Sequence, residues 1–319
     1  MKVLVAGATG AVGRPLVSAL TTAGHEVIGL TSSQNGARIL EERDARGAIA
    51  DVLDPQAVYA ALSGIRLDAA IEELTSLPKH YTADEMRAAA DRDRKVRLEG
   101  GRNVQNAART AGAKRYIVQS TGFSYASAPG LATETDLLAL DAPPGVSAKV
   151  RTYSELEERV FAARDMECVA LRYGFFYGPG TWFTHDGDMA NQVRQRKYPV
   201  IGSGRGVSSY VHIEDAAAAT VAALECSPGV YNVVDDDPVE MSVWLPAFAR
   251  FLGAPSPPSI SEEEVLRTAG PDAVYYATRL RGASNAKAKR ELNFTPRRLE
   301  WLQTGESYVS MRESEVSVK

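Results

Sequence analysis

The first two dozen residues contain the feature that most constrains the fold of this chain. A short apolar run, Val3–Ala6, leads directly into GATGAVG at residues 7–13, and a segment with helical periodicity, Arg14–Ala23, follows. In such a loop the first glycine permits a tight turn, the second lets the backbone approach a pyrophosphate, and the third lets the helix pack on the sheet. The helix N-terminus would hold the phosphates. The alternative is a tight turn without a ligand, but strand, loop and helix together favour dinucleotide binding. We expect the cofactor to contact Gly7, Thr9, Gly10, Ala11, Val12 and Gly13.

Further apolar runs alternate with helical stretches along the chain. The expected strands are Val3–Ala6, Glu26–Leu30, Ala48–Asp51, Ala69–Glu72, Tyr116–Gln119 and Glu167–Arg172. The expected helices show apolar periodicity and are Arg14–Ala23, Pro55–Ser63, Lys95–Ala111, Thr152–Ala163 and Ser261–Ala269. A long surface loop is expected over Ala126–Gly145. This alternation predicts an α/β fold, a doubly wound parallel sheet that binds ligands at the carboxyl ends of its strands.

The composition excludes several classes of protein. A net charge of −4 and a pI near 5.7 offer no general field that would attract nucleic acid or an anionic membrane. No apolar run at the N-terminus is long enough for a signal peptide or a membrane span. Cys168 and Cys226 form no CxxC pair, which indicates two free thiols in a reducing compartment. We expect a soluble, cytoplasmic protein with no metal site.

Several motifs occur in the order found in one enzyme family. They are GATGAVG at residues 7–13, Asp51-Val52, Gln119-Ser120-Thr121, LRYGFFYGPG at Leu171–Gly180, YVHIEDAA at Tyr210–Ala217, Val230–Val233 and Ser284–Lys287. With them the chain resembles the extended short-chain dehydrogenases/reductases, the NAD(P)-dependent epimerase/dehydratase-like enzymes. The resemblance implies a Rossmann domain over residues 1–175, to which 205–237 returns, and a smaller, mainly substrate-binding domain over 176–319. It also implies a small-molecule substrate and a possible homodimer.

The residues after the second expected strand bear on the choice of dinucleotide. Thr31 stands where an NAD site usually places an acid for the ribose 2′-hydroxyl. Thr31, Ser32 and Ser33 carry no charge that would repel a 2′-phosphate, and Arg14 and Arg38 are cations able to reach one. We expect NADP, with NAD as the alternative if both arginines are ordinary surface residues.

Other cofactor contacts are expected along the same edge of the sheet. Asp51 would either accept from the adenine amino group or cap the next turn. The remaining expected contacts are Val52, Leu74, Thr75, Tyr173 and Phe175.

The catalytic residues depart from the family pattern. The resemblance implies a Ser/Thr and a Tyr-x-x-x-Lys pair, in which the tyrosine transfers the proton and the lysine lowers its pKa. Thr121 matches the Ser/Thr, but Lys149 stands at the tyrosine position and Tyr153 at the lysine position. The reversal moves the hydroxyl about 6 Å along the helix, so it cannot serve the same substrate pose. Alternatively, Lys149 is a solvated loop residue and Tyr153 a packed helix residue.

Other residues bear on the substrate and on an alternative acid or base. Ser208 occupies the position of the arginine that usually binds the diphosphate of nucleotide sugars, so such a substrate is disfavoured. An aromatic cluster indicates an apolar pocket, unless its rings are core residues, and comprises Tyr173, Phe175, Phe176, Tyr177, Trp182 and Phe183. Candidate acids or bases are Glu72, Glu73, Thr75, His80, Tyr81, His185 and His212.

These observations favour an NADP-dependent oxidoreductase or epimerase-type enzyme that acts on a small, non-nucleotide substrate. Thr121 would bind the reacting oxygen, and Tyr153, a water or a substrate group would handle the proton. Two alternatives keep the cofactor site. One is a sensor or scaffold without turnover, and the other is an isomerase or cyclase that uses the cofactor structurally.

Overall fold

Seven strands form one sheet at the centre of the structure, a computed structural model that describes residues 1–302. The strands are β1 (Lys2–Ala6), β2 (Glu26–Thr31), β3 (Arg46–Ile49), β4 (Ala69–Glu72), β5 (Arg115–Thr121), β6 (Glu167–Tyr173) and β11 (Gly229–Val233). Their order is β11-β6-β5-β4-β1-β2-β3, and every neighbouring pair is parallel. This order confirms the predicted α/β class with a doubly wound parallel sheet.

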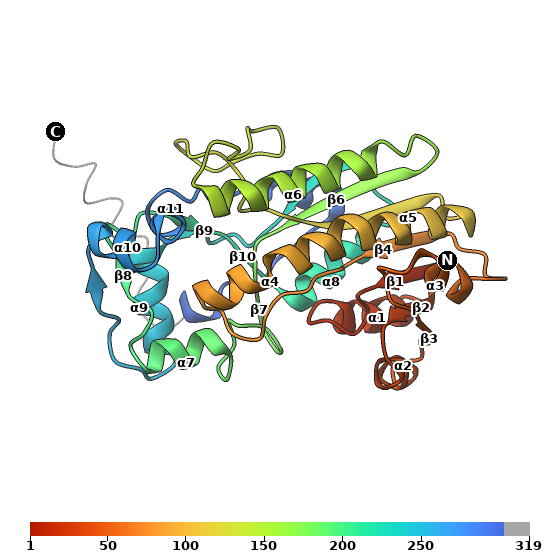
Figure 1. Cartoon of the computed structure of the whole chain (residues 1–319), viewed down its shortest axis with the longest axis horizontal. Coiled ribbons are helices and arrows are strands. Elements are labelled where there is room, and N and C mark those ends of the chain that lie inside the picture. Colours follow the sequence, from red (N-terminus) through yellow and green to blue (C-terminus); the bar gives the residue numbers. More distant parts are fainter. Residues whose placement is uncertain (303–319) are drawn as a thin grey trace.

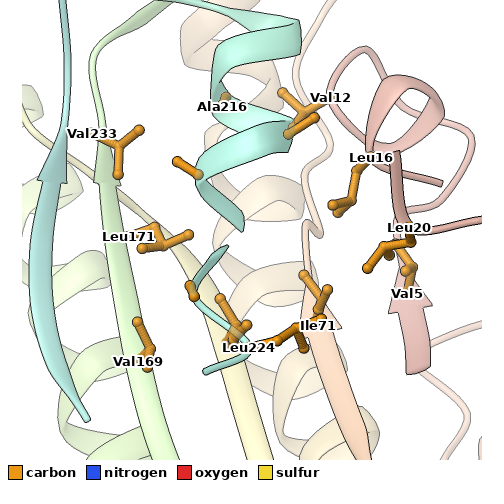
Figure 2. Close-up of a cluster of buried hydrophobic side chains, with 14 of the residues drawn as sticks. Val5, Val12, Leu16, Leu20, Ile71, Val169, Leu171, Ala216, Leu224 and Val233 are labelled. Carbon is orange, nitrogen blue, oxygen red and sulfur yellow. The ribbon is translucent and has the colours of Figure 1, made fainter. Parts of the chain in front are cut away.

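Helices cover both faces of the sheet (Figure 1). They are α1 (Gly13–Thr22), α2 (Gln34–Glu41), α3 (Pro55–Ala61), α5 (Gly101–Thr110), α6 (Pro144–Phe161), α8 (Ile213–Ala222) and α12 (Ala286–Leu292). On one face α1 and α8 pack on the strands, and Figure 2 shows Leu20 of α1 beside Val5 of β1. On the other face Val58 of α3 and Leu156 of α6 belong to a second apolar cluster. The strands are apolar on both sides because both sides are buried.

The strand order reverses between β1 and β4, at the middle of the sheet. The chain leaves β1 toward β2 and β3 on one side, and it continues from β4 toward β5 and β6 on the other. Such a reversal opens a crevice outside the carboxyl ends of the two central strands, where doubly wound folds bind ligands. The glycine loop follows β1 and Glu73 follows β4, so both lie at this crevice.

Smaller elements follow β6 along the chain, and most of those labelled in Figure 1 lie to the left of the sheet. They are β7 (Phe175–Tyr177), α7 (Asp188–Arg194), β8 (Val200–Ile201), β9 (Val207–Ser208), β10 (Tyr210–His212), β12 (Val239–Glu240), α9 (Met241–Phe251), β13 (Ser259–Ile260), α10 (Glu262–Thr268), α11 (Pro271–Thr278) and η2 (Glu300–Leu302). Trp244 and Phe248 of α9 pack with Trp301 in their own apolar cluster. The division at residue 175 stays a prediction, and residues 303–319 of its second part lie outside the described residues.

Two helices differ from their predicted extent. The α4 helix (Ala83–Lys95) and a π-helical turn, η1 (Val96–Gly100), run directly into α5, whereas the sequence predicts a helix only over Lys95–Ala111. The α4 helix has no fully buried residue, so it lacks the apolar periodicity on which such a prediction depends. The α6 helix begins at Pro144 rather than Thr152, because a proline is well suited to the first helical position.

Two buried ion pairs join α6 and its surroundings to the sheet. Arg159 Nη2 lies 2.8 Å from Glu72 Oε2, and Tyr116 donates a hydrogen bond to the same carboxylate. Arg172 Nη2 lies 2.6 Å from Glu157 Oε2. Glu72 is 1% exposed and Glu157 8%. Since a buried charge without its partner is costly, these pairs hold α6 in one position on the sheet.

The buried pair of Glu72 and Arg159 predicts a large loss of stability when the Glu72 side chain is truncated. Glu72→Ala leaves the Arg159 guanidinium buried and unpaired, so we expect the free energy of unfolding to fall by about 3–5 kcal/mol. The control is Glu155→Ala, also on α6, which breaks a half-exposed pair with Arg94 and should cost about 1 kcal/mol or less. Urea unfolding of the three proteins measures both values, and equal losses in the two variants would contradict this account.

Candidate active site

The glycine loop is closely packed at its two ends and open in the middle. Gly7 has a φ of +83°, and a β-carbon there would lie 2.4 Å from the carbonyl oxygen of Glu73. A β-carbon on Gly13 would lie 2.1 Å from the carbonyl oxygen of Gly7. Gly10 is exposed, and its β-carbon would meet only the carbonyl oxygen of Gly7, at 3.2 Å. Gly7 and Gly13 are therefore required by the fold, whereas Gly10 leaves space for a ligand above the loop.

The N-terminus of α1 has unused amide groups. No side chain caps this ten-residue helix, and its first turn carries no acidic residue. Thr9 is half-buried and Ala11 lies beside it in the loop that leads to Val12 at the N-cap. The first amides of a helix point toward a bound anion and carry partial positive charge. The loop and helix therefore fit the pyrophosphate of a dinucleotide.

The residues expected to select the dinucleotide lie at the end of β2. Thr31 is buried, whereas Ser32 and Arg38 are exposed. Ser33 caps α2 by accepting from the amide of Gly36 at 3.1 Å. This end of the strand carries hydroxyl groups rather than a carboxylate, and Arg38 lies on the following helix α2. An arginine near this point would accommodate the 2′-phosphate of NADP. The preference for NADP stays a prediction.

Asp51 was expected to be the last residue of the third strand, but it lies beyond the end of that strand. β3 stops at Ile49, and Asp51 Oδ1 accepts a hydrogen bond from the amide of Leu53 at 2.9 Å. The carboxylate therefore caps the following turn, which was one of the two alternatives. Its contact with adenine stays a prediction.

The other expected cofactor contacts differ in exposure. Val52 is half-buried, Leu74 is buried and Thr75 is exposed. Tyr173 belongs to the apolar cluster under α8, and its hydroxyl lies 2.6 Å from Thr220 Oγ1. Phe175 is stacked on Phe123, with ring centroids 4.3 Å apart. The five contacts stay predictions, and the ring of Tyr173 faces the core.

Thr121 is the last residue of β5 and is 3% exposed. Its hydroxyl oxygen is buried and has no hydrogen-bond partner within the described residues. The neighbouring Ser120 donates to Glu157 of α6 at 2.6 Å. Because Tyr153 precedes Glu157 by one helical turn, α6 carries Tyr153 and then Lys149 onward past the carboxyl end of β5. The three predicted catalytic residues thus lie toward the carboxyl end of β5, but Thr121 makes no hydrogen bond with either of the other two among residues 1–302. Their joint role in catalysis stays a prediction.

Lys149 and Tyr153 lie one helical turn apart on α6, and both are half-buried. The reading of Lys149 as a loop residue is therefore wrong, because the helix begins before it. Lys149 Nζ lies 5.8 Å from the ring centroid of Tyr276, and the Arg97 guanidinium lies 4.9 Å from that of Tyr153. Burial lowers the pKa of Lys149 and raises that of Tyr153. The pair therefore differs from the family's tyrosine and lysine, in which the tyrosine is the activated acid.

Arg97 is a site residue that the sequence analysis did not identify. It lies in the π-helical turn η1, is 2% exposed, and donates from Nε to Asp93 at 2.8 Å. Turns of this kind are frequent at functional sites. The available signal was the Asp93–Arg97 spacing of four residues beside apolar Val96 and Leu98, which is typical of a paired arginine on a buried helix face.

Glu73 is the buried carboxyl next to the glycine loop. Burial raises its pKa to about 8, against a smaller opposing effect of the hydrogen bond with Tyr173. Its Oε1 lies 3.4 Å from the Tyr173 hydroxyl, and Oε2 has no partner within residues 1–302. A pKa raised in this way lets the carboxyl of Glu73, one of the candidate acids, keep its proton near neutral pH.

The candidate histidines and aromatic residues have structural contacts. His212 caps α8 by accepting from the amide of Glu214 at 3.2 Å. His80 lies 2.8 Å from Asp188, and Arg194 donates to the His185 carbonyl oxygen. Of the aromatic cluster, Tyr173 and Phe176 lie in or against the sheet core, and Tyr177, Trp182, Phe183 and Phe175 lie in or against the cluster around α9. The interpretation of these rings as core applies to the buried members, which are Tyr173, Tyr177 and Phe183.

Comparison with known proteins places this site in a family. The family described as "NAD dependent epimerase/dehydratase family" matches residues 3–233, which are more than half of the chain. The chain belongs to the NAD dependent epimerase/dehydratase family. The family is one of enzymes, and the resemblance inferred from the sequence is confirmed.

Two curated members of the family and one solved structure are similar along most of the chain. A 3-diazoavenalumate denitrifying reductase from a Streptomyces species is 40% identical over 304 residues, which cover 94% of this chain and 98% of the relative. A 2-alkyl-3-oxoalkanoate reductase from Stenotrophomonas maltophilia is 28% identical, over 80% of this chain and 77% of the relative. UDP-glucose 4-epimerase from Thermus thermophilus, solved in complex with NAD, superposes with a TM-score of 0.71 at 23% identity, over 94% of this chain and 96% of that one.

The raised pKa of Glu73 predicts how the stability of the protein depends on pH. Its pKa rises from 4.5 in the unfolded chain to about 8 in the folded protein, so between these values the folded state keeps a proton that the unfolded state loses. The free energy of unfolding should therefore fall as the pH rises from about 5 to about 8 and level off above. Urea unfolding at several pH values measures this slope.

Glu73→Gln should make the slope shallower, because an amide does not titrate. The contribution of Asp235, whose pKa burial also raises, should remain. Glu41→Gln, at an exposed position on α2, is the control and should keep the slope of the unmodified protein. An unchanged slope in Glu73→Gln would show that Glu73 ionises normally in the folded protein.

Proposed function

We propose that this protein is an NAD(P)H-dependent reductase of a small, conjugated organic substrate, and that its substrate carries a diazo group. The observation that carries the proposal is the site around Thr121, in which Lys149 and Tyr153 stand in reversed order in an otherwise typical family member. The Streptomyces relative, whose name describes a denitrifying reduction of a diazo compound, supports it through 40% identity along almost the whole of both chains.

The groups around the crevice fit a dinucleotide. The open position at Gly10 and the uncapped N-terminus of α1 would hold the pyrophosphate. The hydroxyl groups at Thr31 and Ser32 and the exposed Arg38 favour NADPH over NADH, although solved relatives bind NAD. When bound, the reduced dinucleotide supplies a hydride.

The reversed pair fits an acceptor that needs no general acid. Reduction of a carbonyl group requires a hydride and a proton, and loss of the proton donor typically costs about 10²–10⁴-fold in rate. In its cationic diazonium form the diazo group is replaced by hydrogen with one hydride, R–N₂⁺ and H⁻ giving R–H and dinitrogen, so the atoms and charges balance without a proton from the protein. A neutral diazo group would leave an anion, which takes its proton from water. Thr121 then binds the substrate beside the cofactor, while Lys149 and Tyr153 contact it rather than protonate it.

The proposed function also divides the chain between cofactor and substrate binding. We assign cofactor binding to residues 1–175 with 205–237 and substrate binding mainly to the remainder. Among residues 1–302, no helix is long and apolar enough to cross a membrane. A cytoplasmic location and a homodimer stay predictions.

The proposed reaction is tested with 3-diazoavenalumate and NADPH or NADH. We expect NADPH oxidation together with release of one dinitrogen per dinucleotide, detected by absorbance and by mass spectrometry. Thr121→Val should lower kcat by about 10²-fold, because it removes a hydroxyl that is already desolvated and free to bind substrate. Tyr153→Phe should stay within about tenfold, because no proton transfer is needed.

Other outcomes distinguish the alternatives. Dinucleotide binding without oxidation of diazo or carbonyl substrates would indicate a sensor or scaffold. A rearranged product without net oxidation of the dinucleotide would indicate an isomerase or cyclase. A large loss in Tyr153→Phe with unchanged Thr121→Val would reverse the assigned roles.

The glycine loop gives a separate prediction for the cofactor. Gly10→Ala should weaken NADPH binding by about tenfold or more, because its β-carbon would enter the space proposed for the pyrophosphate. Stability should change by less than about 1 kcal/mol, because the β-carbon would meet a single protein atom, the Gly7 carbonyl oxygen at 3.2 Å. Gly13→Ala is the contrasting variant, because its β-carbon would lie 2.1 Å from the Gly7 carbonyl oxygen and should destabilise the fold. Fluorescence titration and urea unfolding measure the two effects, and unchanged binding in Gly10→Ala would place the phosphates elsewhere.

A further inference from the structure

Arg97 is a buried cation whose hydrogen bonds are incomplete. Its Nε donates to Asp93 Oδ2 at 2.8 Å, and its guanidinium lies 4.9 Å from the ring centroid of Tyr153. Its Nη1 is buried and has no partner among the described residues. A guanidinium carries five N–H donors, and leaving one of them buried without an acceptor is costly. The arginine therefore has a donor available for a further acceptor.

The nearby carboxylate of Asp93 is already occupied. Its Oδ1 accepts from the amide of Ser76 at 2.6 Å, while Oδ2 holds Arg97. Asp272, whose charge acts on Lys149, accepts from the amides of Gly145 and Val146 at the start of α6. Glu72, whose charge acts on Arg97, is paired with Arg159. None of these carboxylates completes the hydrogen bonds of Arg97.

Lys149 provides a second cation without an ion pair in the part of the chain that the structure describes. Its Nζ lies 5.8 Å from the ring centroid of Tyr276 on α11. Burial lowers its pKa, the positive charge of Arg97 acts in the same direction, and Asp272 and Asp93 act against it. The effect of Arg97 is the smallest of these, but it shows that the two cations are near enough to interact. An anion that contacts both would accept the missing hydrogen bond of Arg97 Nη1 and reduce the repulsion between them.

Each of the two cations lies against an aromatic ring. The ring of Tyr153 lies against Arg97 and that of Tyr276 against Lys149. The hydroxyl of Tyr153 makes no hydrogen bond within residues 1–302 and is a further available donor. Flat aromatic faces next to a planar guanidinium suit a planar, conjugated acid better than a bulky sugar phosphate.

We propose that Arg97 and Lys149 form an anion subsite that binds the carboxylate of the organic acid reduced at this site. The guanidinium donates through Nη1, the ammonium faces the carboxylate from α6, and the two tyrosines flank the conjugated chain. This inference rests on the proposed reductase function for the position of the substrate, and it names the class of that substrate as a conjugated carboxylic acid. Arg97 acts in binding and takes no part in the chemical step.

The test compares an acid with its uncharged ester. With 3-diazoavenalumate as substrate, Arg97→Gln should raise KM by about tenfold or more and leave kcat within about threefold, because the contact is equal in the ground and transition states. With the methyl ester of the same compound, KM should be the same in Arg97→Gln and in the unmodified protein. Arg94→Gln is the matched control, because Arg94 is an exposed neighbour that pairs with Glu155, and it should change neither value.

A binding measurement keeps the inference separate from the proposed reaction. Avenalumate and its methyl ester are titrated by calorimetry into protein saturated with NADP⁺. We expect the acid to bind about tenfold or more tightly than the ester, and this preference to disappear in Arg97→Gln. If 3-diazoavenalumate is not turned over but this preference is present, the proposed reaction fails and the anion subsite stands.

Three results would overturn the subsite. The first is equal binding of acid and ester by the unmodified protein. The second is an Arg97→Gln variant that retains the preference for the acid. The third is a variant that loses affinity for NADPH instead, which would assign Arg97 to the cofactor. If Arg97→Gln does not fold, as circular dichroism would show, Arg97→Lys and Lys149→Gln are titrated in its place and should each reduce the preference for the acid.

Discussion

The close approach of the backbone at Gly7 to that at Glu73 is the contact on which the site depends. The amide of Glu73 donates to the carbonyl oxygen of Ala6 at 2.9 Å, which extends the pairing of β1 and β4 beyond the end of β4. A β-carbon on Gly7 would lie 2.4 Å from the Glu73 carbonyl oxygen. The two backbone segments can therefore approach this closely only because residue 7 has no side chain. This contact holds the glycine loop over the crevice, sets the start of α1 and brings a buried carboxyl next to the loop.

The position of α6 is the second constraint, and buried charges impose it. Glu157 binds Arg172 and accepts from Ser120, so this point of the helix is held to β5 and β6. Tyr153 and Lys149 precede Glu157 by one and two turns, and they lie on the same side of the helix. The order of lysine and tyrosine is therefore free to change without loss of the fold, because neither residue belongs to the buried pairs.

Most of the sheet could be predicted, but much of the remainder could not. Six strands were expected within two residues of their observed ends, because strands buried on both faces are short, apolar and bounded by polar residues. The α4 helix was missed because it has no fully buried residue, and β8, β9, β12 and β13 because two residues carry no periodicity. At the site, the glycine loop and Thr121 were found from local motifs. The Asp93–Arg97 spacing indicates a paired arginine, but it does not show that Arg97, in the π-helical turn η1, contacts Tyr153 of α6.

By itself the sequence determined the doubly wound fold, the glycine loop and the reversed order of Lys149 and Tyr153, because each depends on neighbours along the chain. Only the tertiary structure decided that Arg97 of η1 meets Tyr153 of α6 and that Lys149 of α6 meets Tyr276 of α11. It also decided that Glu73 holds its proton, since burial sets that pKa. Burial and contacts between distant elements follow from packing, and packing is a property of the whole chain rather than of any segment.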